Sequence, residues 1–293
     1  MGVSGRLGRI VVAVGAFMMF LPMTLFPQNS RRDDLLSGTA SGKTRVLDLS
    51  YAINDKLVPW PGDNRWFEAQ VNATVEKNGY FTRSFWMLEH YGTHLDAPIH
   101  FPPGKATVDQ IPAKQFFGPA VVLDVRTEGA KDADYQAPGS SVEAWEKKHG
   151  RILEGSIVLL RTGWASRWPD AEKYRNQDAQ GKMHFPGFSG EAARLLIARK
   201  VNGIGCDTLS VDPGASEDFA VHHLVLGAGL YQLENLADMS SLPEAGAFLM
   251  VAPIKLEGGS GGAVRVFAFW QLRKARVSVN IFRVSCVSKN GFE

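Results

Sequence analysis

The sequence has little cysteine and almost no net charge. Cys206 and Cys286 are the only cysteines among 293 residues, too few for a disulfide framework. In an oxidising compartment the two could pair, but Cys206 lies in an apolar run, and we expect it to be a buried free thiol. The 32 basic and 30 acidic residues leave a net charge of +2 without a basic cluster. This excludes the concentrated positive face of a nucleic-acid-binding protein.

Uncharged apolar runs approaching membrane-spanning length are absent except at the N-terminus. Arg6 and Arg9 precede an uncharged apolar run from residue 10 to 26, the order of the first two regions of an export signal. The run is apolar on every face, which argues against an amphipathic helix, and it is just short of the roughly 18 to 20 residues of a membrane-spanning helix. We therefore expect residues 1–40 to be a signal peptide or membrane anchor plus linker. The mature protein is then exported, periplasmic or secreted, either free or tethered at its N-terminus.

No internal repeat or low-complexity linker divides residues 41–293, which we expect to form one domain. Runs rich in β-branched and aromatic residues predict strands at 46–49, 81–88, 120–125, 157–161, 201–204, 247–251 and 263–269. Helical periodicity is clear in three places: after Ser189, a candidate N-cap, and at 142–149 and 221–227, the last joined by Gly229 to a further strand. Strands scattered along the chain with helices at intervals predict an α/β (α+β) domain that is rich in strands.

One stretch, residues 162–189, shows no clear periodicity. It contains several aromatic residues, glycines and prolines, and His184 lies within it. A segment of this length without regular structure is uncommon in a compact domain, so the stretch is either functional or an insertion. Two interpretations stay open for His184: a residue that faces the substrate, or an ordinary surface histidine.

Five of the seven histidines fall in two short clusters. The first is His90-Tyr-Gly-Thr-His94-Leu-Asp96-Ala-Pro-Ile-His100, and the second begins at His222-His223 and ends at Glu234-Asn235. Imidazole nitrogens and carboxylate oxygens are ligands of zinc and also suit manganese or iron. A lone histidine is usually a satisfied polar residue, but three histidines and an aspartate this close together predict a metal site.

The local sequence predicts how the first cluster is presented. Gly92 and Pro98 disfavour a helix here. A strand running into a tight loop fits better, and it places His94 and Asp96, two residues apart, on the same side. Pro98 then stiffens the exit, so that His100 is presented from a rigid segment.

The run from His90 to Phe101, HYGTHLDAPIHF, resembles the signature of the cyclase family of metal-dependent hydrolases, which includes bacterial kynurenine formamidases and isatin hydrolases. The resemblance covers about residues 45–270, with further motifs in family order: Trp60-Pro-Gly-Asp63, Arg161-Thr-Gly163, Gly203-Ile-Gly-Cys-Asp207, Ser210-Val-Asp-Pro213, His222-His223 and Glu234-Asn-Leu236. The twelve-residue run is specific, whereas Arg-Thr-Gly alone would carry little weight.

The resemblance implies a swivelling β/β/α domain, usually assembled into homodimers or homotetramers. It implies one or two divalent metal ions per chain, zinc or manganese, held by His90, His94, Asp96, His222 and Glu234. Asp96 can bridge the two metal positions in this scheme. His223, next to His222, would contact the metal ligands rather than a metal. The resemblance also implies that His100 transfers protons and that Trp60 lines the substrate pocket.

These implications predict an enzyme that acts on a small molecule. We expect a metal-dependent amidohydrolase that cleaves the C–N bond of an arylformamide, as kynurenine formamidases do, with a metal-activated water molecule. Trp60, with aromatic residues such as Phe85 or Trp164, would stack on a planar substrate. Two alternatives stay open: a cyclic amide or lactone hydrolase of the isatin type, and an exported metal-binding protein without catalysis. Glu234 favours the two-metal formamidase pattern, and the retained His100 argues against an inactive protein.

Overall fold

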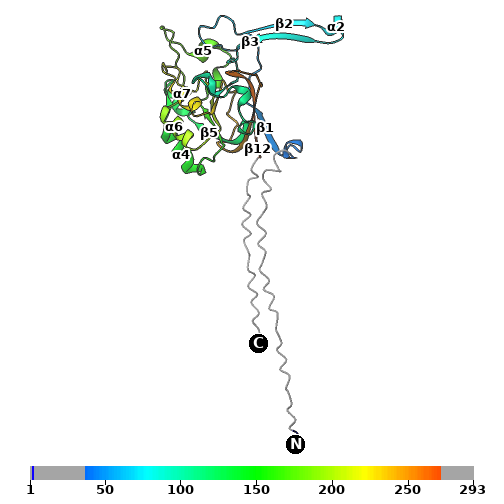
Figure 1. The fold of residues 1–293 in the computed structure, drawn as a ribbon. Helices are drawn as coiled ribbons and strands as arrows, with labels where there is room; N and C mark the ends of the chain where they lie inside the picture. Colours follow the sequence, from blue (N-terminus) through cyan, green and yellow to red (C-terminus); the bar gives the residue numbers. More distant parts are fainter. Residues whose placement is uncertain (1, 3–36, 272–293) are drawn as a thin grey trace, which may run out of the picture.

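A barrel of seven strands forms the centre of the computed structural model, which describes residue 2 and residues 37–271 (Figure 1). Eight strands join in one sheet in the order β1-β12-β11-β5-β7-β9-β10-β4, and β4 also pairs with β12, which closes the ring. One edge of β12 is shared, because β4 pairs with residues 261–263 and β1 with residues 267–271. The strands are β1 (Thr44–Asp48), β4 (His94–Asp96), β5 (Phe117–Asp124), β7 (Ile157–Arg161), β9 (Gly203–Cys206), β10 (Tyr231–Glu234), β11 (Ala245–Pro253) and β12 (Gly261–Gln271).

The parallel strands β5, β7 and β9 are apolar on both faces because both faces are covered. On β7, Ile157 and Leu159 belong to the core inside the barrel. Val158 and Leu160 belong to a second core, which the helices α4 (Gly139–His149), α6 (Gly190–Ala198) and α7 (Ala220–Gly227) complete on the outside. Continuous apolar runs are expected for strands buried in this way.

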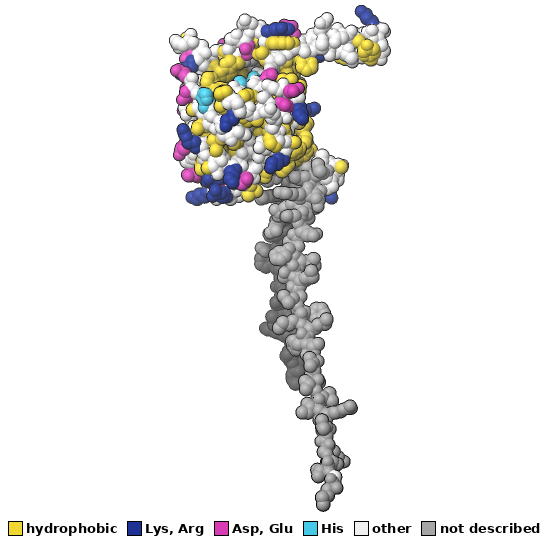
Figure 2. Space-filling model, in the orientation of Figure 1, with side chains coloured by type: hydrophobic (Ala, Val, Ile, Leu, Met, Phe, Trp, Pro, Cys, Tyr) yellow, Lys and Arg dark blue, Asp and Glu magenta, His cyan; other side chains and the backbone are white. Residues whose placement is uncertain are grey.

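A two-stranded hairpin of β2 (Phe67–Ala73) and β3 (Thr82–Met87), with the short helix α2 (Val75–Asn78) at its tip, projects from the barrel (Figure 1). Hydrophobic side chains are visible along this arm in Figure 2. Large exposed hydrophobic residues of the arm are Val71, Val75, Tyr80, Phe81, Phe85 and Trp86.

The aromatic stretch 162–189 folds into short elements. It holds the 3-10 turn Trp164–Arg167, helix α5 (Ala171–Arg175) and β8 (Gly187–Phe188), which pairs with β6 (Gln136–Ala137). A third hydrophobic cluster joins this stretch to the loop that carries Trp60, through the buried residues Val58, Trp164, Tyr174, Met183, Phe185 and Leu209. The remaining short elements are α3 (Arg126–Lys131) and the 3-10 turns Pro98–His100, Val108–Gln110 and Ala113–Phe116.

The predicted fold class is confirmed: the domain is mixed α/β, rich in strands and poor in helices. Ser189 caps α6, accepting a hydrogen bond from the Ala192 amide at 3.1 Å, and the strand expected after Gly229 is β10. The strand predicted at 201–204 begins two residues later, at Gly203. Cys206 is a buried free thiol, as expected.

Most of the predicted N-terminal signal or anchor segment lies outside the described residues, as does Cys286. In the part of the chain that is described, no helix has the length and apolar character needed to cross a membrane.

Candidate metal centre

The first histidine cluster lies on a short strand whose polar face turns away from the barrel core. On β4, Leu95 is fully buried in that core. Because side chains alternate along a strand, His94 and Asp96 project together to the other face, as the sequence predicted. Strand β10 places Glu234 opposite His94, and α7 supplies His222, whose Nε2 lies 3.5 Å from Asp96 Oδ2.

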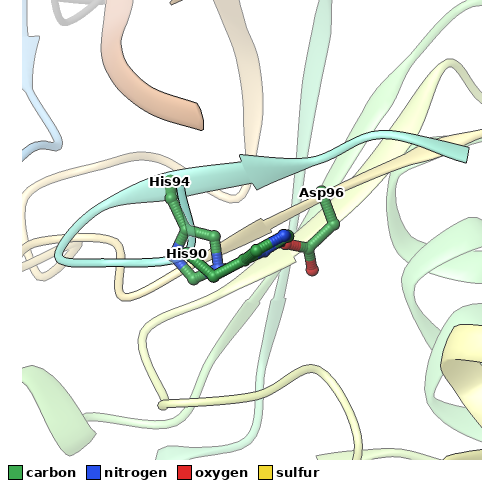
Figure 3. A group of neighbouring side chains, drawn as sticks. All are labelled: His90, His94 and Asp96. Carbon is green, nitrogen blue, oxygen red and sulfur yellow. Dashed lines mark hydrogen bonds and ion pairs between the residues drawn. The ribbon is translucent and has the colours of Figure 1, made fainter. Parts of the chain in front are cut away.

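His90, His94 and Asp96 turn towards one another (Figure 3). His90 Nδ1 and His94 Nε2 lie 2.6 and 3.1 Å from the same oxygen, Asp96 Oδ1. Glu234 lies between two imidazoles, with Oε2 3.5 Å from His94 Nε2 and Oε1 3.4 Å from His222 Nε2. The five residues predicted to bind metal therefore meet at one place.

Two of the imidazoles are oriented through Nδ1. His94 donates from Nδ1 to the Gly92 carbonyl at 3.0 Å, and His222 donates from Nδ1 to Asp212 Oδ2 at 2.6 Å. Asp212 also accepts the backbone N–H groups of Val221 and His222 at the start of α7. Both histidines therefore turn Nε2 towards the cluster, the orientation typical of metal-binding histidines.

His90 is oriented in the opposite sense. Its Nε2 lies 2.9 Å from Ser260 Oγ, and the Ser260 hydroxyl donates to Glu89 Oε2 at 2.7 Å. Because the hydroxyl proton goes to Glu89, the serine oxygen accepts from His90 Nε2–H. The lone pair of His90 Nδ1 then faces an oxygen of Asp96, a contact that requires a proton or a metal ion.

Burial and charge act in opposite directions on the ionisable groups of the cluster. Burial lowers the pKa of His94, but the carboxylates of Asp96 and Glu234 outweigh it and raise that pKa to about 9. Burial also lowers the pKa of His222, but its contacts with Asp212, Asp96 and Glu234 outweigh burial and raise that pKa well above 6.5. Burial raises the pKa of Asp96, but the three neighbouring histidines hold it well below 3.8. The cluster thus retains protons at the positions where a metal ion would supply the positive charge.

The donor set fits a divalent metal ion. Imidazole nitrogens and carboxylate oxygens converge, with no cysteine among them. Asp96 Oδ2 is buried and makes no hydrogen bond, and its neighbour His222 Nε2, at 3.5 Å, is too far for a good one, which is costly for a charged oxygen. A divalent cation held by His90, His94 and Asp96 would satisfy the carboxylate and replace the retained protons.

His100 lies beside the cluster on the 3-10 turn that begins at Pro98. Its ring stacks on that of His90 with centroids 3.9 Å apart, and it also forms a possible ligand group with Asp96 and His222. Burial lowers the pKa of His100 to about 4. At pH 7 its imidazole is therefore neutral.

The cluster opens into a cavity of about 290 Å³, which is lined by Trp60, His90, His94, His100, Phe101, Leu209, Ser210, Phe219, His222, Glu234 and Asn235. Trp60 is in the wall, as its motif position implied. Phe85 and Trp164, which we expected to stack on a planar substrate, do not line this cavity. Phe85 is exposed on the hairpin and Trp164 is buried in the third hydrophobic cluster, so Phe101 and Phe219 supply the other aromatic walls.

Two further histidines lie outside the cavity wall. His184 Nδ1 pairs with the Asp134 carboxylate at 2.9 Å, which raises its pKa. His223 is exposed, and its ring meets the edge of Phe101. A larger cavity of about 1020 Å³ lies at the opposite end of the barrel, where β5 begins, and it contains none of the cluster residues.

Several residues that shape the site were not assigned by the sequence. Asp212 stands inside the motif Ser210-Val-Asp-Pro213, but nothing there shows that it orients a histidine ten residues later. Ser260 is 170 residues from His90. Phe219 precedes the second cluster and Asn235 ends it; neither has a side chain that typically binds metal, and neither was assigned a role from the sequence.

Comparison with known proteins agrees with this geometry. The model of the Cyclase family matches residues 47–213, more than half of the chain. This chain belongs to the cyclase family. Isatin hydrolase of Roseibium aggregatum is 34% identical over 244 residues, which cover 78% of this chain and 92% of that protein. Kynurenine formamidase of Salinibacter ruber is 29% identical over 226 residues, covering 75% and 95%.

Solved structures of the cyclase family share the fold. Isatin hydrolase A from Labrenzia aggregata superposes with a TM-score of 0.76 at 34% identity, covering 82% of this chain and 99% of that one. The isatin hydrolase A structure from Ralstonia solanacearum gives a TM-score of 0.75, also at 34% identity, over 82% and 97%. The chain is therefore a hydrolase of this metal-dependent family, and its histidine and carboxylate cluster fits a divalent metal.

Proposed function

We propose that this cyclase-family hydrolase opens the ring amide of a small, uncharged and planar cyclic substrate, the class to which isatin belongs. The observation that carries the proposal is the wall of the metal-side cavity. Beside the histidine and carboxylate cluster, the wall consists of Trp60, Phe101, Phe219 and Leu209 with Ser210 and Asn235, and no lysine or arginine is among its described residues. A volume of about 290 Å³ is at the lower end for ligand pockets and suits a bicyclic molecule. Similarity to isatin hydrolases in both sequence and structure supports the same class.

Hydrolysis adds water across the amide bond: a C–O bond forms at the carbonyl carbon, the C–N bond breaks, and the nitrogen gains a proton. A divalent metal ion, when bound, polarises the carbonyl group and activates the water. His100 takes the proton from water and returns it to the leaving nitrogen. The position of His100, stacked on His90 and facing the cavity, suits this transfer.

The aromatic walls orient the substrate. Trp60 and Phe219 have ring centroids 6.1 Å apart, and Phe101 lies 5.7 Å from Phe219, so three rings surround the space beside the cluster. Offset or edge contacts with a planar ligand stabilise it beyond the burial of its surface. Such a wall holds the ring amide against the metal ligands and excludes bulk water.

An arylformamide is the second candidate. Glu234 lies between His94 and His222, and Asp96, His100 and His222 form a second possible ligand group beside the first. This arrangement supports a two-metal site, the pattern that the sequence favoured for formamidases. Kynurenine formamidases are also among the relatives. However, N-formylkynurenine carries a carboxylate, for which the described cavity wall offers no lysine or arginine.

A substrate panel on metal-reconstituted protein tests the proposal. We expect isatin to have the highest kcat/KM, above N-formylkynurenine, simple lactones and cyclic imides. His94→Ala and the metal-free protein are the controls and should be inactive. A higher kcat/KM for N-formylkynurenine would support the second candidate, and inactivity on every amide would overturn both.

We also propose that the mature protein is exported, on the strength of its basic and then apolar N-terminus. Cell fractionation of the tagged full-length chain tests this. Recovery of the unprocessed chain in the cytoplasm would contradict export.

A homodimer or homotetramer is the third part of the proposal. An isolated two-stranded hairpin is marginally stable in water, and the arm of β2 and β3 exposes several large apolar side chains. A second copy that covers the arm would remove this surface from water. Light scattering should therefore give a multiple of the monomer mass, and Phe85→Ser with Trp86→Ser should lower it. Leu153→Ser, at an exposed leucine in the loop between α4 and β7, is the control.

A further inference from the structure

Asn235 connects the two strands that carry the proposed metal ligands. It follows Glu234 at the end of β10, and its Nδ2 donates to the Gly92 carbonyl at 3.0 Å. His94 donates from Nδ1 to the same carbonyl, also at 3.0 Å. In return, the Thr93 hydroxyl donates to the Asn235 carbonyl at 2.7 Å. The Gly92 carbonyl therefore has two donors, and one of them belongs to a candidate metal ligand.

The backbone of Asn235 is shaped for this contact. Its φ is 54°, in the left-handed region that asparagine tolerates better than most residues. Its amide donates to the Thr208 carbonyl at 3.0 Å, which anchors the turn to the segment after β9. The chain thus turns sharply after Glu234, and the buried Asn235 side chain reaches β4.

Tyr174 holds the other end of the Asn235 amide. It comes from α5, in the stretch 162–189, and its hydroxyl lies 3.1 Å from Asn235 Oδ1 and 2.8 Å from the Asp207 carbonyl. The single hydroxyl hydrogen is shared between these two acceptors. Tyr174 is fully buried, which raises its pKa well above 10 and keeps it a donor. Its ring packs edge-on against Trp168, which is stacked on Tyr51 with centroids 4.1 Å apart.

We propose that Tyr174 and Asn235 are positioning residues for the metal centre. Together they hold the Gly92 carbonyl where it accepts from His94 Nδ1, so that the lone pair of Nε2 points to the metal position. Loss of such an outer hydrogen bond typically lowers metal affinity or activity by about tenfold to a hundredfold. The inference rests on the proposed function only in taking the cluster as a metal site. The inference also assigns a role to the stretch 162–189, because α5 carries Tyr174, which supports the metal centre.

Three variants test the role. Tyr174→Phe removes only the hydroxyl. Asn235→Gly keeps a residue that tolerates positive φ but removes the side chain, and Asn235→Asp keeps the shape and the acceptor but removes the donor to Gly92. Tyr231→Phe is the matched control: Tyr231 is also fully buried, and its hydroxyl donates to the Gln115 carbonyl at 3.1 Å, outside this network.

The measurements are the Zn²⁺ dissociation constant by chelator competition, the visible spectrum of the Co²⁺-loaded protein, and the melting temperature of the metal-free protein. We expect both Asn235 variants to bind Zn²⁺ about tenfold to a hundredfold more weakly, with Tyr174→Phe changed in the same direction. The Co²⁺ spectrum should change in these variants and stay as wild type in Tyr231→Phe. Wild-type affinity and spectrum in all three variants would overturn the role. The role would also be overturned if Tyr231→Phe lost as much Zn²⁺ affinity as these variants and the losses simply followed the fall in melting temperature.

Failure of the proposed function would look different. A wild-type chain that binds Zn²⁺ but hydrolyses no amide of the panel would defeat that function. The binding comparison among the variants would still decide the role of Tyr174 and Asn235, because it does not use turnover.

Discussion

Asp212 Oδ2 lies 2.6 Å from His222 Nδ1, and the same carboxylate accepts the backbone N–H groups that begin α7. One buried side chain therefore fixes both the start of the helix and the orientation of the histidine on it. α7 has only eight residues and is not part of the sheet. The position of His222 relative to β4 and β10 therefore depends on its contacts with Asp212.

Asp212→Asn should lower metal affinity by about tenfold to a hundredfold. The asparagine side chain keeps one acceptor oxygen, but its NH2 group faces the His222 and Val221 N–H donors that the aspartate carboxylate satisfies. Chelator competition measures the effect. Asp218→Asn, at an exposed carboxylate of the same loop, is the control and should bind metal as wild type does. Equal affinities in Asp212→Asn and wild type would contradict the role of Asp212.

Metal uptake should release protons, and affinity should rise with pH. In the metal-free protein the Asp96 and Glu234 carboxylates raise the pKa of His94 to about 9, so at pH 7 this ring carries a proton that a metal ion must displace. Raising the pH towards 9 removes that competition, and lowering it strengthens the competition. Zn²⁺ titrations in buffers of different ionisation enthalpy count the protons released. An affinity independent of pH between 6 and 9 would contradict this expectation.

The first group of candidate metal ligands was predictable because its members are close together in the sequence. His90, His94 and Asp96 fall within seven residues, and the alternation of a strand is enough to place two of them on one face. Their side chains, two imidazoles and a carboxylate, are also of the types that bind divalent metals. The supporting residues are different: Ser260 reaches His90 across 170 positions, and Tyr174 reaches Asn235 across 61. Such partners depend on the closure of the barrel, which no short pattern encodes.

Strands were predictable where β-branched or aromatic residues are concentrated. β7 is such a run, buried along its whole length, and its predicted bounds are the observed ones. β3 is mostly exposed and was still predicted, because it contains Phe85 and Trp86, whereas β2 has only Phe67 and Val71 of these types and was missed. The closing strand β4 is only three residues long, and its pairing with β12 comes from the other end of the domain.

Acid should destabilise the fold partly through Glu146. The Arg199 guanidinium, at 2.7 Å, lowers the pKa of this carboxyl to about 2 from an ordinary 4.5. A depressed pKa contributes stability that is present above pH 4.5 and is lost as the pH falls towards 2. Glu146→Gln should cost about 1 kcal/mol at pH 7, since the pair is partly exposed, or about 2–4 °C in Tm. The difference from wild type should shrink below pH 4. Glu143→Gln, exposed on the same helix, should show no such trend.

His100→Asn should separate catalysis from metal binding. The ring stacks on His90 and lines the cavity, where it can exchange a proton with water and substrate. Loss of general acid–base help should reduce kcat by about a hundredfold to ten-thousandfold. Metal content and Tm should stay near wild type, because His90, His94 and Asp96 are unchanged. His94→Ala should instead lose metal and activity together. Metal stoichiometry, Tm and kcat on the same preparations distinguish these cases. Loss of metal in His100→Asn would make His100 a ligand, and a metal-loaded variant with nearly full activity would remove it from the mechanism.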